Sequence, residues 1–151
     1  MEKYTLTTEE LFAALQEAFR DGGCFPLGIT GWSMRPILRH GRDTVWLRAF
    51  CPENCKRGSI LLFRRSNGRF VLHRVRKCLP GGYRMNGDAQ TWCEDILKEQ
   101  VVAQACQIQR KGKVISCNAP GLKIWDALWF PTRPIRPALF GVGHHIKKIF
   151  H

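Results

Sequence analysis

The sequence predicts a mainly β protein, in which a small distorted β-barrel or sandwich-like core carries an N-terminal helix and a C-terminal amphipathic helical tail. Two observations predict this class. Six or seven short segments rich in β-branched and aromatic residues, separated by turn residues, fill fewer than a hundred positions. A segment with helical spacing of apolar residues precedes them, and another follows. At 151 residues the chain suffices for one domain with a buried core.

The N-terminal helix is predicted over residues 7–20. Thr7 and Glu10 have the spacing of a capping box, in which each side chain satisfies a backbone N–H at the helix start. The apolar residues at helical spacing are Leu11, Leu15, Ala18 and Phe19. The pair Gly22-Gly23 is expected to end the helix.

Up to seven strands are predicted after this helix. They are residues 25–29, 44–50, 59–65, 69–78, 82–85, 101–110 and, beyond a turn, 113–117. The steps Ser66-Asn67-Gly68 and Lys111-Gly112 are typical of β-hairpin turns. The pattern predicts the strands but leaves their pairing open.

The last part of the chain has a different composition, so three regions are predicted: a helix over 1–23, a β domain over 24–118 and a basic aromatic tail over 119–151. In the tail, a short helix with Leu122, Trp125, Leu128 and Trp129 on one side precedes a proline-rich break and a second apolar and basic stretch. Aromatic residues interleaved with Lys and Arg suit a segment lying on a membrane surface, although packing onto the core or a partner protein is the alternative.

Neither a membrane-spanning run of about 20 apolar residues nor the features of a secretory signal are present. We therefore expect a cytoplasmic protein, with a peripheral position at the inner membrane face as a further possibility.

The formal net charge is +12, and residues 33–84 alone hold 13 basic and two acidic side chains. Such an excess favours either a polyanionic partner or a solvated basic face.

No cofactor and no metal ion are expected. The seven cysteines are scattered, and without an export signal we expect them to be reduced thiols. Only Cys51 and Cys55 lie close together, and a second close pair, which a zinc site commonly needs, is missing.

The stretch GITGWSMRPILRHGRD, residues 28–43, is the strongest candidate for chemistry. Ser33 follows Gly31 by two positions, and a glycine there permits a tight turn that exposes the hydroxyl and nearby N–H groups. A serine needs a base for its proton and donors for the oxyanion before it attacks a carbonyl carbon. Taken alone, this Gly-x-Ser pattern also fits an ordinary turn.

His73, inside the predicted strand 69–78, is the best candidate base, since imidazole titrates near neutral pH. Alternation places it on the face opposite Leu72 and Arg74; a histidine on a polar face of a barrel is the simpler alternative. The carboxylate that would orient the imidazole is expected among Asp88, Glu94 and Asp95.

Four ordered motifs, GWSMRPIL, RGSILLFR, FVLHRV and YRMNGDA, resemble those of the signal peptidase I family, which forms one superfamily of β-rich serine peptidases with the LexA-type self-cleaving repressors. The resemblance covers about residues 25–110. It implies that Ser33 is the nucleophile, within a turn formed by Gly31, Trp32 and Met34. It also implies that His73 replaces the lysine base of most bacterial members, as in the endoplasmic-reticulum and sporulation-type branch.

Asp88 matches the aspartate of the family's Gly-Asp turn and is our first choice as orienting carboxylate, with Glu94 and Asp95 as alternatives. The chain departs from the family pattern in two motifs, where Arg42 is inserted between Gly41 and Asp43 and where Ser59 replaces an aspartate. The N-terminal membrane anchor of a signal peptidase and the DNA-binding domain of a repressor are also missing from this sequence.

The resemblance thus predicts a serine endopeptidase that cleaves a peptide or precursor protein through an acyl-serine. The membrane surface, reached through residues 122–150, is a further expected partner, whereas specific nucleic acid is not expected. The alternative is an inactive protein with the peptidase fold that binds a polyanion, either nucleic acid or an anionic membrane, through the basic segment. The sequence does not indicate an oligomeric state or a cleavage site.

Overall fold

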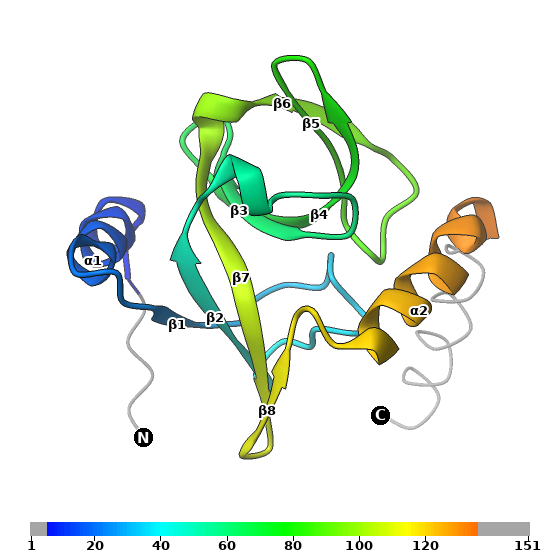
Figure 1. The fold of residues 1–151 in the computed structure, drawn as a ribbon, viewed down its shortest axis with the longest axis horizontal. Coiled ribbons are helices and arrows are strands. Elements are labelled where there is room, and N and C mark those ends of the chain that lie inside the picture. The colour runs from blue at the N-terminus through cyan, green and yellow to red at the C-terminus, as the bar shows by residue number, and fades with distance from the viewer. Residues whose placement is uncertain (1–5, 136–151) are drawn as a thin grey trace, which may run out of the picture.

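The computed structural model describes residues 6–135, apart from the side chains of Lys123, Asp126, Phe130 and Arg133. Its dominant feature is one curled antiparallel sheet, with helices at opposite sides (Figure 1). The elements are α1 (Thr8–Arg20), β1 (Phe25–Gly28), β2 (Asp43–Ala49), η1 (Pro52–Asn54), β3 (Ile60–Arg64), β4 (Phe70–Leu79), β5 (Gly82–Asn86), β6 (Glu94–Leu97), η2 (Lys98–Gln100), β7 (Val101–Arg110), β8 (Lys113–Ser116), α2 (Pro120–Trp129) and η3 (Phe130–Ile135).

The N-terminal helix begins where the sequence predicts. Thr7 is the N-cap of α1, and the Thr7 and Glu10 side chains each accept a hydrogen bond from the other residue's backbone N–H. Leu15 is buried in the core beneath the helix, and Leu11 and Phe19 pack around the same cluster. Helix α1 therefore covers the sheet beside β1 (Figure 1).

The eight strands form one open sheet, so the predicted barrel is wrong although the mainly β class is confirmed. The strand order is β1-β2-β7-β3-β4-β5-β6, and β8 pairs with β7 off this path. Closure would require a ladder between the two end strands, and no such ladder joins β1 to β6 in the described part of the chain. Both predicted hairpins, β3–β4 and β7–β8, are present.

Three register shifts explain how the sheet curls without closing. They lie between Trp46 and Leu47, between Leu62 and Phe63, and between Val75 and Lys77. An extra residue on one strand bends that strand and increases its twist. Such irregularities leave no clear pattern in the sequence, which is why strand spacing alone suggested a barrel.

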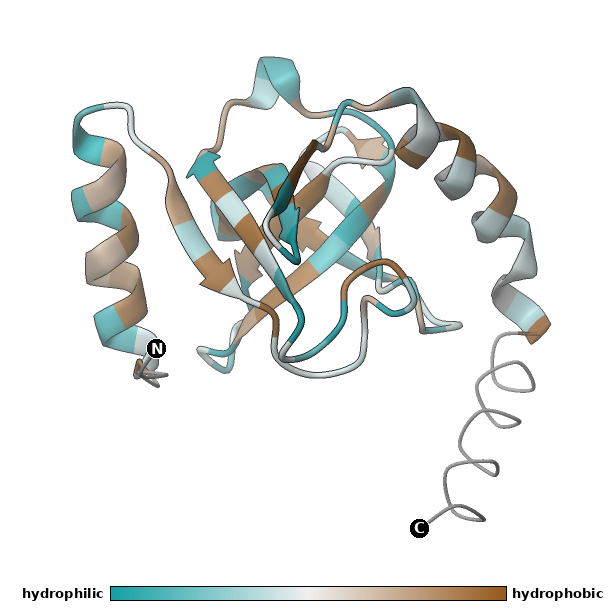
Figure 2. Ribbon diagram, turned by 90° about the horizontal axis from the view of Figure 1, so that it is seen from below, coloured by the Kyte–Doolittle hydropathy of each residue, from teal (hydrophilic) through white to brown (hydrophobic). Residues whose placement is uncertain are grey.

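Two apolar clusters form the core, and brown and teal segments alternate along several strands (Figure 2). The first cluster joins α1, the β1–β2 connection, β2, β3 and β7; its buried members are Leu15, Ile29, Met34, Leu38, Val45, Leu47, Ile60, Leu62, Ala103, Ala105 and Ile108. The second cluster joins β3 to β6 and contains Leu61, Phe63, Val75, Tyr83, Met85 and Ile96. His73 pairs with Leu61 across β3 and β4, so its side chain shares the face of the second cluster.

The predicted C-terminal helix is present as α2, and the proline-rich stretch after it continues as the short helix η3. Leu122 packs against the first core cluster, and the rings of Trp125 and Trp129 stack with centroids 5.2 Å apart. The second apolar and basic stretch of the predicted tail lies outside the described residues. Across residues 6–135, no helix combines the length and the apolar character that crossing a membrane requires.

Candidate active site

The loop of residues 29–42 connects β1 to β2, and we call it the nucleophile loop because it carries Ser33, the predicted nucleophile. Gly31 has φ of +81°, a backbone conformation that glycine adopts without strain, and its N–H donates to Nδ1 of His40 at 3.1 Å. The N–H of Gly41 donates to the carbonyl of Ile29 at 3.2 Å. These bonds close the loop on itself at its base.

Two buried side chains and one buried carboxylate fix this loop. Met34 and Leu38 lie in the first core cluster, 3% and 0% exposed. Asp43, buried where β2 begins, accepts hydrogen bonds from both Arg42 and Arg110 and from the backbone N–H of Arg39. Burial acts to raise the pKa of Asp43, but these bonds outweigh it and lower the pKa, so the carboxylate stays charged.

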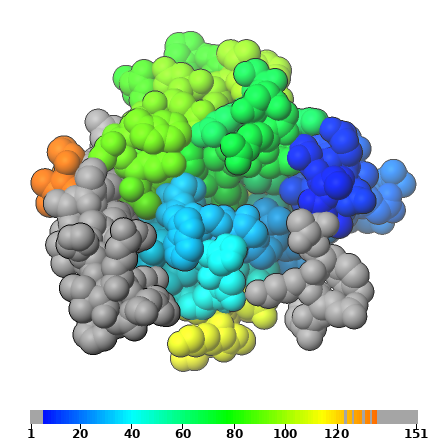
Figure 3. Space-filling model, turned by 180° about the vertical axis from the view of Figure 1, so that it is seen from behind, coloured from blue at the N-terminus to red at the C-terminus, as the bar shows by residue number. Residues whose placement is uncertain are grey.

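Ser33 lies half-buried against the turn that follows β5. Its carbonyl accepts the N–H of Ala89 at 2.8 Å, and a Cβ on Gly87 would come within 2.8 Å of the same oxygen. Figure 3 shows the blue and cyan residues of the nucleophile loop against the green segment near residue 90. Glycine at 87 therefore allows the two segments to touch.

Two backbone N–H groups of the nucleophile loop, at Ser33 and the residue after it, make no hydrogen bond to the described protein. Among the described residues, the N–H groups of Ser33 and Met34 donate to no protein acceptor. A serine amide and the amide next to it can stabilise an oxyanion formed at the serine hydroxyl. These two amides are therefore candidates for the donors that acyl transfer needs.

Trp32, the other residue of the predicted nucleophile turn, points outward and is 58% exposed. Its ring stacks on that of His40 with centroids 5.7 Å apart, and the guanidinium of Arg35 lies 5.0 Å from the indole centroid. Trp32 therefore forms an aromatic and cationic surface beside the loop.

His73 is buried on β4, 1% exposed, between the rings of Phe63 and Trp92. Burial lowers its pKa to about 4, against an opposing attraction from Glu94. The imidazole is therefore neutral near pH 7, which is the state in which it can accept a proton. Nδ1 makes no hydrogen bond in the structure and lies 3.6 Å from Oε1 of Glu94.

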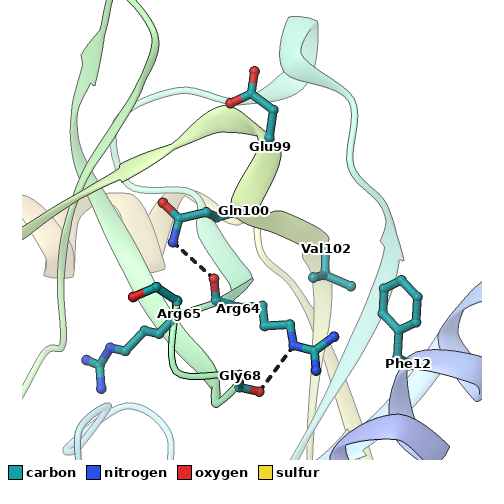
Figure 4. A pocket seen from close by; sticks show the side chains of 8 residues that line it. Phe12, Arg64, Arg65, Gly68, Glu99, Gln100 and Val102 are labelled. Atoms are coloured by element: carbon teal, nitrogen blue, oxygen red, sulfur yellow. Dashed lines mark hydrogen bonds between the residues drawn. The ribbon is translucent and has the colours of Figure 1, made fainter.

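Glu94 is held in this position by Arg65. Nε and Nη2 of Arg65 donate to the two carboxylate oxygens at 3.1 and 2.6 Å, and the guanidinium lies 5.7 Å from the centroid of the Trp92 ring. The neighbouring Arg64 points the other way (Figure 4), toward α1, where it forms an ion pair with Glu9 at 2.8 Å. The two consecutive arginines at the end of β3 therefore bind different carboxylates, Arg64 on the side of α1 and Arg65 on the side of His73.

Asp88, our first choice as orienting carboxylate, binds two arginines through its carboxylate oxygens. Nε and Nη2 of Arg74 donate to it at 2.9 Å each, and Nη2 of Arg76 donates at 3.3 Å. Asp95, the second alternative, pairs with Arg84 at 2.8 Å and is half-exposed. Of the three expected carboxylates, the one that the structure places beside the His73 ring is Glu94.

The turn at residues 87–89 and the residues just after it connect the surroundings of Ser33 to those of His73. Ser33 contacts the 87–89 turn, and Trp92, a few residues beyond that turn, packs on His73. Within residues 6–135, no hydrogen bond joins Ser33 to His73, so the nucleophile–base contact stays a prediction.

Several contributors to the site were not predicted. Arg65 and Trp92 surround His73 and Glu94, and Nε1 of Trp129 on α2 donates to the carbonyl of Asp88 at 2.6 Å. Trp129 appeared in the sequence only as part of an apolar helix face. Nothing in the sequence marks these contacts, because each joins residues that are distant along the chain.

The described residues contain no group of three or more His, Cys, Asp or Glu side chains arranged to hold a metal ion. Cys51 donates to Glu53, whereas Cys55 packs against the second core cluster. The two closest cysteines in the sequence therefore have separate surroundings.

Comparison with known proteins gives no assignment: no protein-family model matches the chain, and no curated protein matches it. The function is therefore inferred from the site itself and from the resemblance in its motifs.

Proposed function

We propose that the protein is a serine endopeptidase of the signal peptidase I-like type, with Ser33 as nucleophile and His73 as general base. The observation that carries the proposal is the buried neutral imidazole of His73, whose Nδ1 faces a carboxylate held by an arginine. A neutral imidazole with one nitrogen turned toward a carboxylate has the polarity of a base in acyl transfer. The free N–H groups of Ser33 and Met34 support the same chemistry.

In the proposed reaction, Oγ of Ser33 attacks the scissile carbonyl carbon while Nε2 of His73 takes the hydroxyl proton. The Ser33 and Met34 amides hold the oxyanion. When the C–N bond breaks, His73 returns its proton to the leaving amine, and an acyl-serine remains. A water molecule then attacks the acyl carbon, gives its proton to His73, and the acid product leaves as Ser33 regains the proton.

Glu94 takes the role of orienting carboxylate in this proposal. A carboxylate beside Nδ1 favours the tautomer with its proton on Nδ1, which leaves Nε2 able to accept one. It also stabilises the imidazolium formed during the reaction. Asp88 instead stabilises the turn against which Ser33 lies, through its bonds to Arg74 and Arg76.

A peptide substrate suits the position of the site. β1 leads directly into the nucleophile loop, and of the described strands it pairs only with β2. An extended peptide can add to such an edge through main-chain hydrogen bonds. We therefore propose a peptide or precursor-protein substrate bound in extended form; cytoplasmic location and docking on an anionic membrane remain part of the proposal.

The internal pairing of the arginines weighs against the alternative of a polyanion-binding module. Six of the 13 basic side chains in residues 33–84 pair with carboxylates within the molecule, in the pairs Arg42–Asp43, Arg64–Glu9, Arg65–Glu94, Arg74–Asp88, Arg76–Asp88 and Arg84–Asp95. Side chains engaged in this way are less available to phosphates. Strong salt-dependent binding of nucleic acid that survives Ser33→Ala would instead favour the alternative.

The test of the proposed function is digestion of a peptide library followed by mass spectrometry. Wild type and Ser66→Ala, which changes an exposed serine in the β3–β4 turn, are expected to cleave the same peptide bonds. Ser33→Ala is expected to cleave none of them. Equal cleavage by all three proteins, or none by wild type, would contradict the proposal.

A further inference from the structure

A cavity of about 640 Å³ lies at the junction of β3, β7 and α2, apart from Ser33 and His73. The β3–β7 ladder covers only Leu61 to Phe63 on β3. Before Leu61 the chain turns away through residues 56–59, whereas β7 continues along β2 and β8 through Ala105 to Ile108. The cavity lies where these two strands diverge, and its volume is within the range of small-molecule sites.

The wall of this cavity carries positive charge. Arg48, Lys56, Arg57 and Arg74 all line it, and its described lining residues include no Asp or Glu. Arg48 belongs to β2, Arg74 to β4, and the other two to the segment before β3, so the four cations come from three separate parts of the chain. Asp88 neutralises Arg74, but no carboxylate of the described lining lies beside the other cations, so the cavity favours an anionic ligand.

Two buried polar atoms of the wall have no hydrogen-bond partner. Nε of Arg48 is buried without an acceptor. Gln104 is only 4% exposed; its Nε2 donates to the carbonyl of Asn54 at 3.2 Å, and its Oε1 accepts no hydrogen bond. A buried polar group without a partner is costly, and most such groups in proteins are satisfied. The cavity therefore lacks both an acceptor for Arg48 and a donor for Gln104.

We propose that this cavity binds a phosphate group, on a small molecule or on a lipid headgroup. A phosphate monoester supplies several acceptor oxygens and up to two negative charges, and its second pKa of about 6 leaves part of it singly protonated near neutral pH. The oxygens satisfy Arg48 and the neighbouring cations, and the remaining P–O–H donates to Oε1 of Gln104. A carboxylate offers a single charge and, when ionised, no donor.

The site is linked to the nucleophile loop through one side chain. Arg74 lines the cavity and also binds both carboxylate oxygens of Asp88, in the turn against which Ser33 lies. Phosphate bound beside Arg74 shares that guanidinium with Asp88. The binding site itself uses neither Ser33 nor His73, so it does not depend on the proposed peptidase activity.

The test is calorimetric titration of the full chain with inorganic pyrophosphate, at constant ionic strength. We expect saturable binding at one site, with affinity about tenfold lower in Arg48→Gln and in Gln104→Leu, since each loses one hydrogen bond to a charged ligand. Arg69→Gln, which removes an exposed arginine of the β3–β4 turn, is the matched control and should bind as wild type does. Should Gln104→Leu fail to fold, Arg48→Gln suffices, because Arg48 is only half-buried.

A second arm separates the two sources of phosphate. Sedimentation with vesicles of phosphatidylcholine and phosphatidic acid, whose headgroup is a phosphate monoester, would assign the site to a lipid headgroup if it is weakened by Arg48→Gln and not by Arg69→Gln, without binding of pyrophosphate. Binding of pyrophosphate with the same dependence on Arg48 would assign it to a soluble ligand. Absence of binding in both arms, or equal weakening by Arg48→Gln and Arg69→Gln, would overturn the proposal.

Discussion

Nδ1 of His73 lies 3.6 Å from Oε1 of Glu94, and Nε and Nη2 of Arg65 donate hydrogen bonds to the two oxygens of that carboxylate. The distance is just beyond hydrogen-bond length, and a small movement of either side chain would close it. This pairing connects the middle of β4 to the first residue of β6. It makes Glu94 the positioning residue of the proposed site.

Glu94→Gln should therefore lower kcat/KM by at least about tenfold, because the amide no longer stabilises the imidazolium or fixes its tautomer. The attraction of Glu94 raises the pKa of His73 against the effect of burial, so its loss should also move the acidic limb of the kcat/KM profile to lower pH. Asp95→Asn, on the neighbouring residue, should leave both quantities unchanged. An unchanged pH profile in Glu94→Gln would contradict the assignment.

The buried imidazole of His73 should also make stability depend on pH. The folded protein keeps the ring neutral down to its pKa of about 4, while the unfolded chain protonates it near pH 6.5. The unfolded state thus binds more protons between these values, and the free energy of unfolding falls as pH falls from 6.5 to 4, by up to about 3 kcal/mol. Urea denaturation across this range should show the fall in wild type and a smaller one in His73→Phe. Equal falls in both proteins would show that His73 is not its source.

Asp88→Asn should destabilise the fold, because it leaves the buried guanidinium groups of Arg74 and Arg76 without their carboxylate. Breaking a buried ion pair by removing one partner costs about 3 kcal/mol or more. Chemical denaturation measures this as a lower midpoint with an unchanged slope. Asp95→Asn removes the carboxylate of an exposed pair and should hardly move the midpoint. Similar midpoints for the two variants would be the contrary result.

Gly87→Ala tests the close approach between the turn and Ser33. The added methyl group would lie 2.7 Å from Oε1 of Gln90 and 2.8 Å from the Ser33 carbonyl, so the turn and the nucleophile loop must move apart, at a cost of about 1–3 kcal/mol. We expect kcat/KM to fall further than this loss of stability explains, because Ser33 moves with the loop. Gly81→Ala adds the same methyl group in open space and is the control. Full activity in a folded Gly87→Ala protein would refute the role of this contact.

Local features of the fold were predictable from the sequence because they depend on neighbouring residues. The capping box of Thr7 and Glu10, the hairpins after β3 and β7, and the face on which His73 lies all follow from short-range rules. Strand β6 was missed, because its four residues begin with two carboxylates and show too little alternation. That omission hid the fact that Glu94 and Asp95 lie on opposite faces.

The choice among carboxylates could not be predicted, because it depends on which arginine each one meets. Asp88 meets Arg74 and Arg76 from β4, Glu94 meets Arg65 from the end of β3, and Asp95 meets Arg84 from β5. These contacts follow from strand order and register, including the extra residue near Arg76. Neither the order of the strands in the sheet nor the positions of the register shifts can be predicted from a single sequence.

If Ser33 and His73 act as one catalytic unit, as proposed, kinetic comparison of their single and double variants will show it. On the best-cleaved library peptide, Ser33→Ala and His73→Ala should each lower kcat/KM by about a thousandfold or more, and the double variant should lose no more than the worse single one. Wild-type activity in either single variant, or losses that multiply in the double variant, would contradict the claim.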